Sequence, residues 1–263
     1  MGLTQTEGFK MALFLNGGGS DEQVKEAYLF LKEKADTNKP LLYIPLAMEK
    51  EKYPSCLDWI TKEMSDYHFS KIDMVTSVEE LATKEFNKYG AIFIGGGDTY
   101  KLLADLKSCS AYEKIQNFLA TGGTVFGGSA GAIIFGKNLD SCSHEDKNTV
   151  GLQDTSGFNQ VFGAYIGAHY KNGNPEREKN ATEAFTKLSF KGPVVALPEE
   201  DTLMIDKSEV RVIGSRNFYT FKNGVRYTHK PQTYSIDGFK KELASTTEVN
   251  PLQIKAYNSN GIA

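Results

Sequence analysis

The chain is poor in cysteine and histidine and has no excess of charge of one sign. Its three cysteines, Cys56, Cys109 and Cys142, form no CxxC pair, which argues against a disulfide framework or a zinc knuckle and favours a reducing cytoplasm. The four histidines form no HxxxH or HxH pair, so we expect no metal site and no other cofactor. Lys and Arg number 30 against 33 Asp and Glu, which gives no electrostatic reason to expect a nucleic-acid partner.

The sequence also lacks an apolar run long enough to cross a bilayer. Its longer apolar stretches, such as Ala91–Ile94 and Ala132–Phe135, are far too short. Residues 1–19 include an apolar segment but have neither the basic start nor the cleavage site of a signal peptide. Met1-Gly2 matches the beginning of a myristoylation signal, but Thr6 fits it only loosely and no second anchor follows. We therefore expect a cytoplasmic protein without a membrane partner.

Apolar runs alternate with amphipathic stretches in the first half of the chain. Strands are expected at residues 11–18, 40–47, 68–77, 91–97 and 123–129. Helices are expected between them, with Ser20 and Ser77 as capping residues, and another helix is expected to begin after Ser129. This alternation predicts an α/β fold with a mostly parallel sheet and helices on both faces.

The pattern changes near residue 191. Residues 191–230 contain short strand-like segments joined by tight turns, and Asn223-Gly224 is typical of a hairpin turn. Residues 231–263 make up the C-terminal segment. No low-complexity linker or internal repeat divides the chain, so residues 1–263 are expected to form one α/β domain with an antiparallel extension at 191–230. A homodimer is the commonest default for such a protein.

Three glycine-rich turns follow predicted strands, at Asn16–Gly19, Gly95–Asp98 and Gly127–Gly131. Ligands of open α/β sheets bind beyond the carboxyl ends of the strands, where these turns should converge. The third turn reads GxSxG around Ser129, between a predicted strand and a predicted helix. On such a sharp turn the serine hydroxyl is exposed at the top of the sheet, beside a helix N-terminus that stabilises negative charge. A plain strand–helix turn that holds a phosphate is the alternative.

The second turn, Gly95-Gly96-Gly97-Asp98-Thr99, can direct a backbone N–H into the same crevice. The N–H groups of Gly97 and Ala130 would then form a two-donor oxyanion hole. A dinucleotide-binding turn is the alternative, but neither glycine cluster reads GxGxxG after the first strand.

Residues 92–103 (IFIGGGDTYKLL) and 126–132 (FGGSAGA) together resemble the paired signature of the dipeptidase E (aspartyl dipeptidase)/cyanophycinase family of serine peptidases. The resemblance implies a class I glutamine-amidotransferase-like fold. Relatives with that fold often have cysteine where this chain has Ser129. A weaker likeness continues through residues 161–170 and 194–206.

The resemblance implies catalytic residues in the order serine, histidine, acid. Ser129 would be the nucleophile and His169, which follows an apolar segment, the general base. His144 lies in a polar stretch and is expected in a solvated loop, while His68 and His229 are expected at the surface.

Two adjacent glutamates are candidates for the catalytic acid, the residue whose carboxylate orients His169. Matching the following strand without a gap selects Glu200, whereas keeping Leu197 and Pro198 in register selects Glu199. We predict Glu200, with Glu199 as the alternative. Its carboxylate would hold the imidazole and stabilise its protonated form.

Substrate contacts are also implied by the resemblance. The family's dipeptidase uses an arginine downstream of its histidine to bind an aspartate side chain, and Arg177 is the nearest candidate, although a solvated position at the start of a helix is an equal alternative. Asp98 stands where that dipeptidase has asparagine, so it would either hold the substrate's amino terminus or repel an acidic side chain. We expect Asp98, Thr99 and Arg177 to bind substrate.

The leading hypothesis is a serine peptidase that hydrolyses short peptides, including dipeptides with an N-terminal aspartate, through an acyl-enzyme on Ser129. An α/β-hydrolase esterase shares the GxSxG, but its acid would precede the histidine, as Asp140 or Asp154 does, and it fits the glycine triplet less well. A non-catalytic small-ligand-binding protein with the same fold is the third hypothesis. For that protein, loss of Ser129 would leave binding intact.

Overall fold

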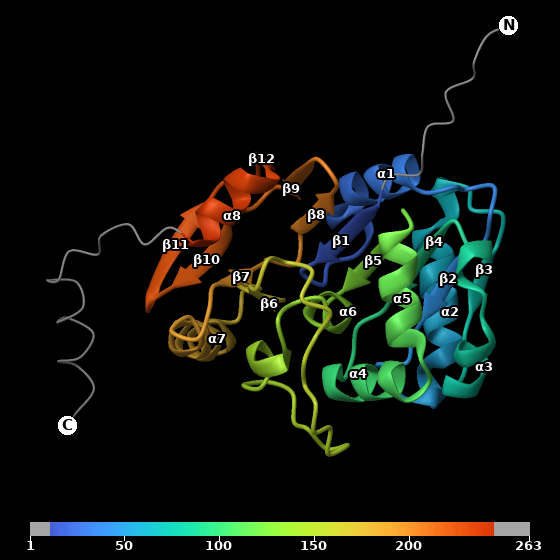
Figure 1. Cartoon of the computed structure of the whole chain (residues 1–263), viewed down its shortest axis with the longest axis horizontal. Coiled ribbons are helices and arrows are strands. Elements are labelled where there is room, and N and C mark those ends of the chain that lie inside the picture. The colour runs from blue at the N-terminus through green and yellow to red at the C-terminus, as the bar shows by residue number, and fades with distance from the viewer. Residues whose placement is uncertain (1–10, 245–263) are drawn as a thin grey trace, which may run out of the picture.

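The computed structural model describes residues 11–244. Residues 1–10 and 245–263 lie outside this description, and with them the Met1-Gly2 start and the last part of the segment 231–263. The described strands form two sheets, which lie beside each other in Figure 1. No helix of residues 11–244 is long and apolar enough to span a membrane.

The larger sheet is built around the strands that the first half of the sequence predicts. Its strands, in spatial order, are β12 (Thr233–Ser235), β9 (Glu209–Ile213), β8 (Thr202–Asp206), β1 (Ala12–Asn16), β5 (Thr124–Gly128), β4 (Ala91–Ile94), β2 (Leu41–Ile44) and β3 (Ile72–Met74). From β1 to β3 all neighbours are parallel, whereas β8, β9 and β12 are antiparallel to theirs. The predicted α/β class with a mostly parallel sheet is confirmed.

The strands predicted between residues 191 and 230 are present, but they divide between the two sheets. β8 and β9 extend the larger sheet, because β1 is buried along its whole length and its second edge needs a partner strand. The smaller sheet contains, in spatial order, β11 (Val225–His229), β10 (Phe218–Lys222), β7 (Val194–Ala196) and β6 (Tyr165–Gly167).

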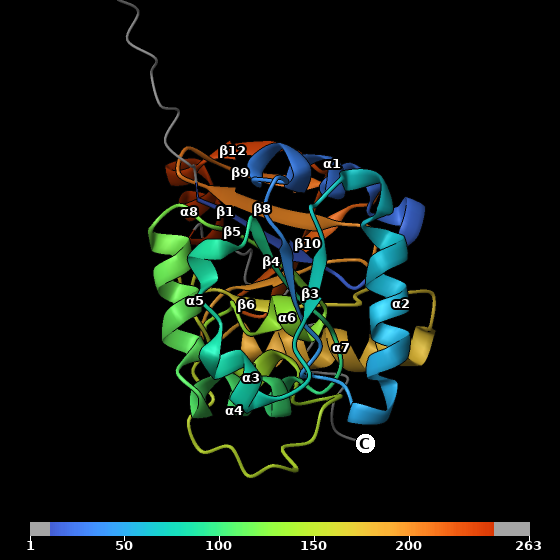
Figure 2. The same ribbon diagram turned by 90° about the vertical axis from the view of Figure 1, so that its right-hand side faces the viewer.

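Helices cover both faces of the larger sheet, as Figure 2 shows. On one face lie α1 (Lys25–Lys34) and α2 (Tyr53–Glu63), and on the other α3 (Val78–Thr83), α4 (Thr99–Ser108) and α5 (Ala111–Ala120). The remaining helices are α6 (Ala130–Ile133), which follows β5, α7 (Pro175–Leu188), which packs on the smaller sheet, and α8 (Ile236–Ala244). Short 3-10 turns are η1 (Asp21–Gln23), η2 (Lys50–Lys52), η3 (Ser65–Tyr67), η4 (Phe86–Lys88) and η5 (Leu139–Ser141).

The capping prediction for Ser77 is confirmed, since its hydroxyl accepts a hydrogen bond from the Glu80 N–H at 3.1 Å. Helix α6 is shorter than the sequence pattern suggests. The N–H groups of Phe158 and Gln160 bond to the carbonyls of Ile134 and Phe135, which a longer helix would have used for its own ladder.

An aromatic row crosses four neighbouring strands of the larger sheet on the face covered by α1 and α2. It consists of Phe14, Phe126, Phe93 and Tyr43, which are paired in register from β1 to β2. The rings of Phe93 and Phe126 stack with their centroids 4.7 Å apart. Trp59 from α2 stands edge-on to Phe93 at 5.8 Å. The row lies close to the carboxyl ends of these strands, where the glycine-rich turns begin.

Candidate active site

Ser129 occupies the sharp turn between β5 and α6. Its backbone has φ 52° and ψ −114°, a conformation that a residue with a side chain rarely adopts and that the surroundings must hold in place. A Cβ on Gly131 would lie 2.3 Å from the Ile94 carbonyl oxygen, so only glycine allows this close approach of turn and strand. The Ser129 N–H donates to the Asn16 carbonyl at 3.1 Å, which fixes the turn against the end of β1.

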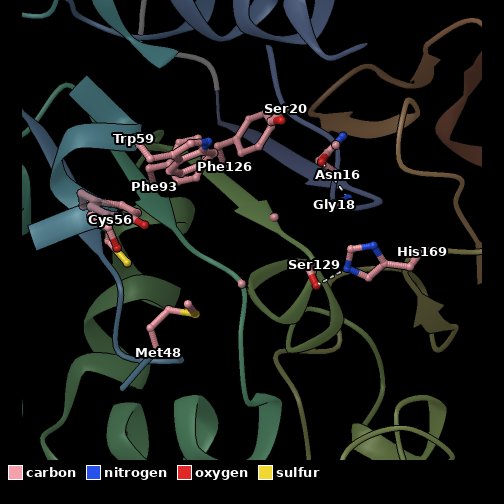
Figure 3. A pocket seen from close by; sticks show the side chains of 15 residues that line it. Asn16, Gly18, Ser20, Met48, Cys56, Trp59, Phe93, Phe126, Ser129 and His169 are labelled. Atoms are coloured by element: carbon pink, nitrogen blue, oxygen red, sulfur yellow. Dashed lines mark hydrogen bonds between the residues drawn. The ribbon is translucent and has the colours of Figure 1, made fainter. Parts of the chain in front are cut away.

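The imidazole of His169 lies against the Ser129 hydroxyl, with Oγ and Nε2 2.7 Å apart (Figure 3). The His169 N–H donates to the Gly17 carbonyl at 2.8 Å, so the end of β1 positions the histidine as well. A Cβ on Gly18 would meet the imidazole at 2.1 Å, and the glycine is therefore what leaves room for the ring. The structure thus brings together the two residues that the sequence places 40 positions apart.

Glu199, and not Glu200, contacts the other side of the imidazole. Its Oε1 lies 2.7 Å from His169 Nδ1. An ionised carboxylate only accepts hydrogen bonds, so Nδ1 carries the proton and Nε2 is left to accept from Ser129. Glu200 points away and pairs with Arg216 at 3.2 Å.

The prediction that Glu200 lies against His169 is therefore wrong, and the alternative, Glu199, is the residue beside the imidazole. The reason is a turn in which the Asp201 N–H bonds back to the Pro198 carbonyl at 3.1 Å. Within that turn the two glutamates point to different sides. The Glu199 carbonyl accepts from the Gly19 N–H at 2.9 Å, which holds this residue beside the histidine.

Asn16 is a positioning residue that the sequence analysis missed. Its side chain, in a residue only 1% exposed, lies at the end of β1. Its amide nitrogen is 3.2 Å from the Glu199 carbonyl and 3.0 Å from the Thr202 hydroxyl, and its amide oxygen accepts from the Gly18 N–H at 2.8 Å. The feature of the sequence that could have indicated this role is a polar residue at the end of an otherwise apolar strand, directly before glycines.

Backbone donors lie on both sides of the serine. The Ala130 N–H is in the first turn of α6 and has no partner within the helix. Within residues 11–244, the N–H groups of Gly96 and Gly97 also have no hydrogen-bond acceptor. Gly96 packs on Ser129, since a Cβ there would lie 3.0 Å from the serine Cβ. Gly97 lines a cavity together with Ser129.

Two cavities meet at Ser129 and His169, which line both. The first, here called the aromatic cavity, has a volume of about 460 Å³ and opens over the aromatic row (Figure 3). Its side chains include Tyr43, Met48, Cys56, Trp59, Phe93 and Phe126. The second, here called the polar cavity, has a volume of about 250 Å³. Its side chains include Thr99, His144, Glu145, Asp146, Arg177 and Phe185.

In the polar cavity, Arg177 and Glu145 form a bidentate ion pair. Arg177 Nε and Nη2 donate to the two carboxylate oxygens of Glu145 at 2.6 and 2.7 Å. Burial alone would raise the pKa of Glu145, but the arginine holds that pKa below its usual range. Asp146 accepts from the N–H and the hydroxyl of Thr99 at 3.2 and 2.5 Å. Two carboxylates and one guanidinium leave this cavity negative.

His144 also lines the polar cavity, so the prediction of a solvated loop is wrong. Its side chain is 14% exposed and stands edge-on to Phe185 at 5.3 Å. Burial lowers the pKa of His144, which keeps the ring neutral near neutral pH. His229 is likewise covered rather than on the surface, since its side chain is only 12% exposed and bonds to the Thr220 hydroxyl at 2.8 Å. His68 is exposed, as expected.

The remaining candidates lie elsewhere. Asp98 caps α4 by accepting from the Lys101 N–H at 2.9 Å, and it lines neither cavity. The acids of the esterase hypothesis are paired with lysines, Asp140 with Lys191 at 3.5 Å and Asp154 with Lys107 at 2.7 Å. Among the described residues, no cluster of three His, Cys, Asp or Glu side chains is arranged to hold a metal ion.

Comparison with known proteins gives a consistent set of relatives. The family model of peptidase family S51 matches residues 13–213. A Peptidase E from Nostoc sp. is 29% identical over 238 residues, 85% of this chain and 95% of that protein. A Peptidase E from Shewanella denitrificans is 24% identical over 212 residues, 77% of this chain and 86% of that protein.

Two crystal structures share the fold. A putative peptidase E protein from Listeria monocytogenes superimposes with a TM-score of 0.62 at 22% identity, over 78% of this chain and 99% of that one. A peptidase from an acI-B1 actinobacterium superimposes with a TM-score of 0.67 at 19% identity, over 87% of this chain and 98% of that one.

Asp201 lies in the same turn as Glu199, and its burial predicts that the free energy of unfolding depends on pH. Burial raises the pKa of Asp201 from 3.8 to about 7, and its Oδ2 has no hydrogen-bond partner among residues 11–244. Between these two values the folded protein keeps a proton that the unfolded chain releases, so the free energy of unfolding should fall as the pH rises through this interval. Asp201→Asn should flatten that part of the profile in denaturant titrations at about pH 5 and about pH 8. The exposed Asp58, changed to Asn, is the control, and an unchanged slope in the Asp201 variant would contradict the assignment.

Proposed function

Because the chain belongs to peptidase family S51 and is a serine-type peptidase, we propose that Ser129, His169 and Glu199 hydrolyse short peptides through an acyl-enzyme. The observation that carries this proposal is the continuous hydrogen-bonded series from hydroxyl to imidazole to carboxylate, with both distances 2.7 Å. The esterase hypothesis has no such support, because Asp140 and Asp154 pair with lysines and the carboxylate bonded to His169 is that of Glu199.

Each side chain of the series has a defined task. His169 Nε2 takes the hydroxyl proton while Ser129 Oγ attacks the scissile carbonyl carbon, and Glu199 stabilises the imidazolium that forms. The oxyanion of the tetrahedral intermediate accepts hydrogen bonds from the N–H groups of Ala130 and Gly97. His169 then returns the proton to the leaving amine, the C–N bond breaks, and water releases the acyl group by the same route.

The polar cavity is suited to the residue that is acylated. The free amino terminus of a short peptide is a cation, and the carboxylates of Glu145 and Asp146 give this cavity a negative charge near Ser129. Thr99 takes part only indirectly, by holding Asp146. The enzyme would meet such peptides in the cytoplasm, where its cysteines, which form no disulfide in the described part of the chain, stay reduced.

The side chain of an N-terminal aspartate in the substrate would compete with Glu145 for Arg177. Arg177 is the cation that could bind the aspartate side chain, but its guanidinium fork is already occupied by Glu145. An acidic substrate must displace that carboxylate, whereas a neutral side chain need not. Glu145 therefore decides how well acidic residues are accepted.

The proposed function predicts covalent chemistry at Ser129. A fluorophosphonate probe should add its mass to the peptide that contains this serine, and the protein should release free amino acids from a panel of dipeptides. Ser129→Ala should abolish both results. Labelling at another residue, or equal turnover by the variant, would assign the nucleophile elsewhere, and ligand binding without labelling or turnover would favour the non-catalytic hypothesis.

The two adjacent glutamates form a matched pair of variants. Glu199→Gln should lower kcat by about a thousandfold or more, because the imidazolium loses its charged partner. Glu200→Gln should change kcat little, since Glu200 pairs with Arg216. Thermal unfolding of both variants serves as the control for folding. A large loss of kcat in the Glu200 variant alone would reverse the assignment.

Removal of the competing charge should change substrate preference. Glu145→Gln should raise kcat/KM for Asp-Leu relative to Ala-Leu by about tenfold, because Arg177 gains a free positive charge. Glu176→Gln, at an exposed position next to Arg177 on α7, is the control. An unchanged ratio in the Glu145 variant would show that Arg177 does not contact the substrate side chain.

A further inference from the structure

The aromatic cavity differs in chemistry from the polar cavity on the other side of Ser129. No Lys, Arg, Asp or Glu is among the described residues that line it, and His169 is the one histidine among them. Tyr43, Phe93 and Phe126 form its floor, and Trp59 reaches it from α2. The cavity thus presents aromatic rings and a few hydroxyl and backbone groups to a ligand.

The position of these rings follows from the register of the sheet. Tyr43, Phe93 and Phe126 are paired partners on β2, β4 and β5, so they lie side by side on one face. Phe126 is covered from α1 by Tyr28 at 5.3 Å, and Tyr43, Phe93 and Phe126 are each only 1–2% exposed, so they form the buried back of the cavity. Rings held by strand pairing in this way form a rigid surface.

The cavity is large enough to hold a substrate side chain. Voids in protein interiors rarely exceed a water molecule or two, whereas about 460 Å³ lies within the range of cavities that bind small ligands. Ligand cavities are also typically lined by apolar and aromatic side chains with few polar groups. An uncharged ring or branched alkyl group is the chemistry that fits here.

The two cavities share Ser129 and His169, so they receive the two sides of one scissile bond. The cationic amino end of a short peptide is attracted by the carboxylates of the polar cavity. The residue on the other side of the bond, which leaves as the free amine, then faces the aromatic cavity. His169 lines this cavity too and can return the proton to that amine.

We infer that the aromatic cavity is the subsite for the side chain of the leaving residue and selects large apolar or aromatic side chains, with Trp59 as a specificity-determining residue. This inference rests on the proposed peptidase function. Burial of an apolar side chain in such a pocket changes kcat/KM by about tenfold to a hundredfold. A charged side chain finds no partner there and should be disfavoured.

The test keeps the first residue constant and varies the second, with Ala-Gly, Ala-Leu, Ala-Phe and Ala-Lys as substrates. We expect kcat/KM for Ala-Phe to exceed that for Ala-Gly by about tenfold or more, with Ala-Lys no better than Ala-Gly. Trp59→Ala should lower kcat/KM for Ala-Phe much more than that for Ala-Gly and so remove most of the preference, and Trp59→Phe should retain it. Leu57→Ala, an exposed position on the same helix, is the matched control.

A second readout does not need turnover. Trp59 is the only tryptophan of the chain, so its fluorescence reports on this cavity alone. In the Ser129→Ala protein, Ala-Phe and Ala-Leu should change the emission in a saturable way, and Ala-Gly should not.

The outcomes separate the inference from the function on which it rests. Equal kcat/KM for Ala-Gly and Ala-Phe would overturn the subsite and leave the peptidase intact. A Trp59→Ala variant that loses both substrates equally would show a structural role and would also overturn the subsite. Failure to hydrolyse any dipeptide, together with absence of probe labelling at Ser129, would overturn the proposed function and this inference with it.

Discussion

The buried amide of Asn16 is the contact on which the active site depends. Its nitrogen is shared by the Glu199 carbonyl and the Thr202 hydroxyl, and its oxygen holds the Gly18 N–H. The carbonyl of the same residue accepts from the Ser129 N–H. One residue therefore fixes the nucleophile, the glycine that accommodates the imidazole and the turn that carries the acid. Without this amide, buried donors and acceptors would lose their partners, which costs more than the bonds themselves contribute.

The topology of the larger sheet explains how distant segments reach this place. An antiparallel strand begins where its neighbour ends, so β8 starts at the carboxyl end of β1, with Thr202 paired to Asn16. The turn before β8 thereby delivers Glu199 to the same edge of the sheet at which β5 delivers Ser129. The cavities then lie on either side of this edge, one over the aromatic row and one beside α7. Their different linings follow from the different elements that wall them.

The sequence predicts what is encoded locally and misses what depends on distant partners. The strand–helix alternation and the turn at Ser129 follow from short patterns of apolar residues and glycines. The choice between Glu199 and Glu200 depends on a turn closed by a backbone hydrogen bond, which no side-chain pattern reveals. The burial of His144 depends on Phe185, far along the chain. The division of the later strands between two sheets depends on the free edge of β1, which only the assembled sheet exposes.

The central place of β1 has a consequence for the chain while it is being synthesised. Chains emerge from the ribosome starting at the N-terminus, so β1 can pair with β5 long before residues 202–206 exist. Until then its other edge is an open apolar strand, a site where nascent chains can associate wrongly. The segment that closes this edge also brings Glu199. A partly synthesised chain therefore contains Ser129 but not Glu199, and the active site is completed only when this edge of β1 is covered.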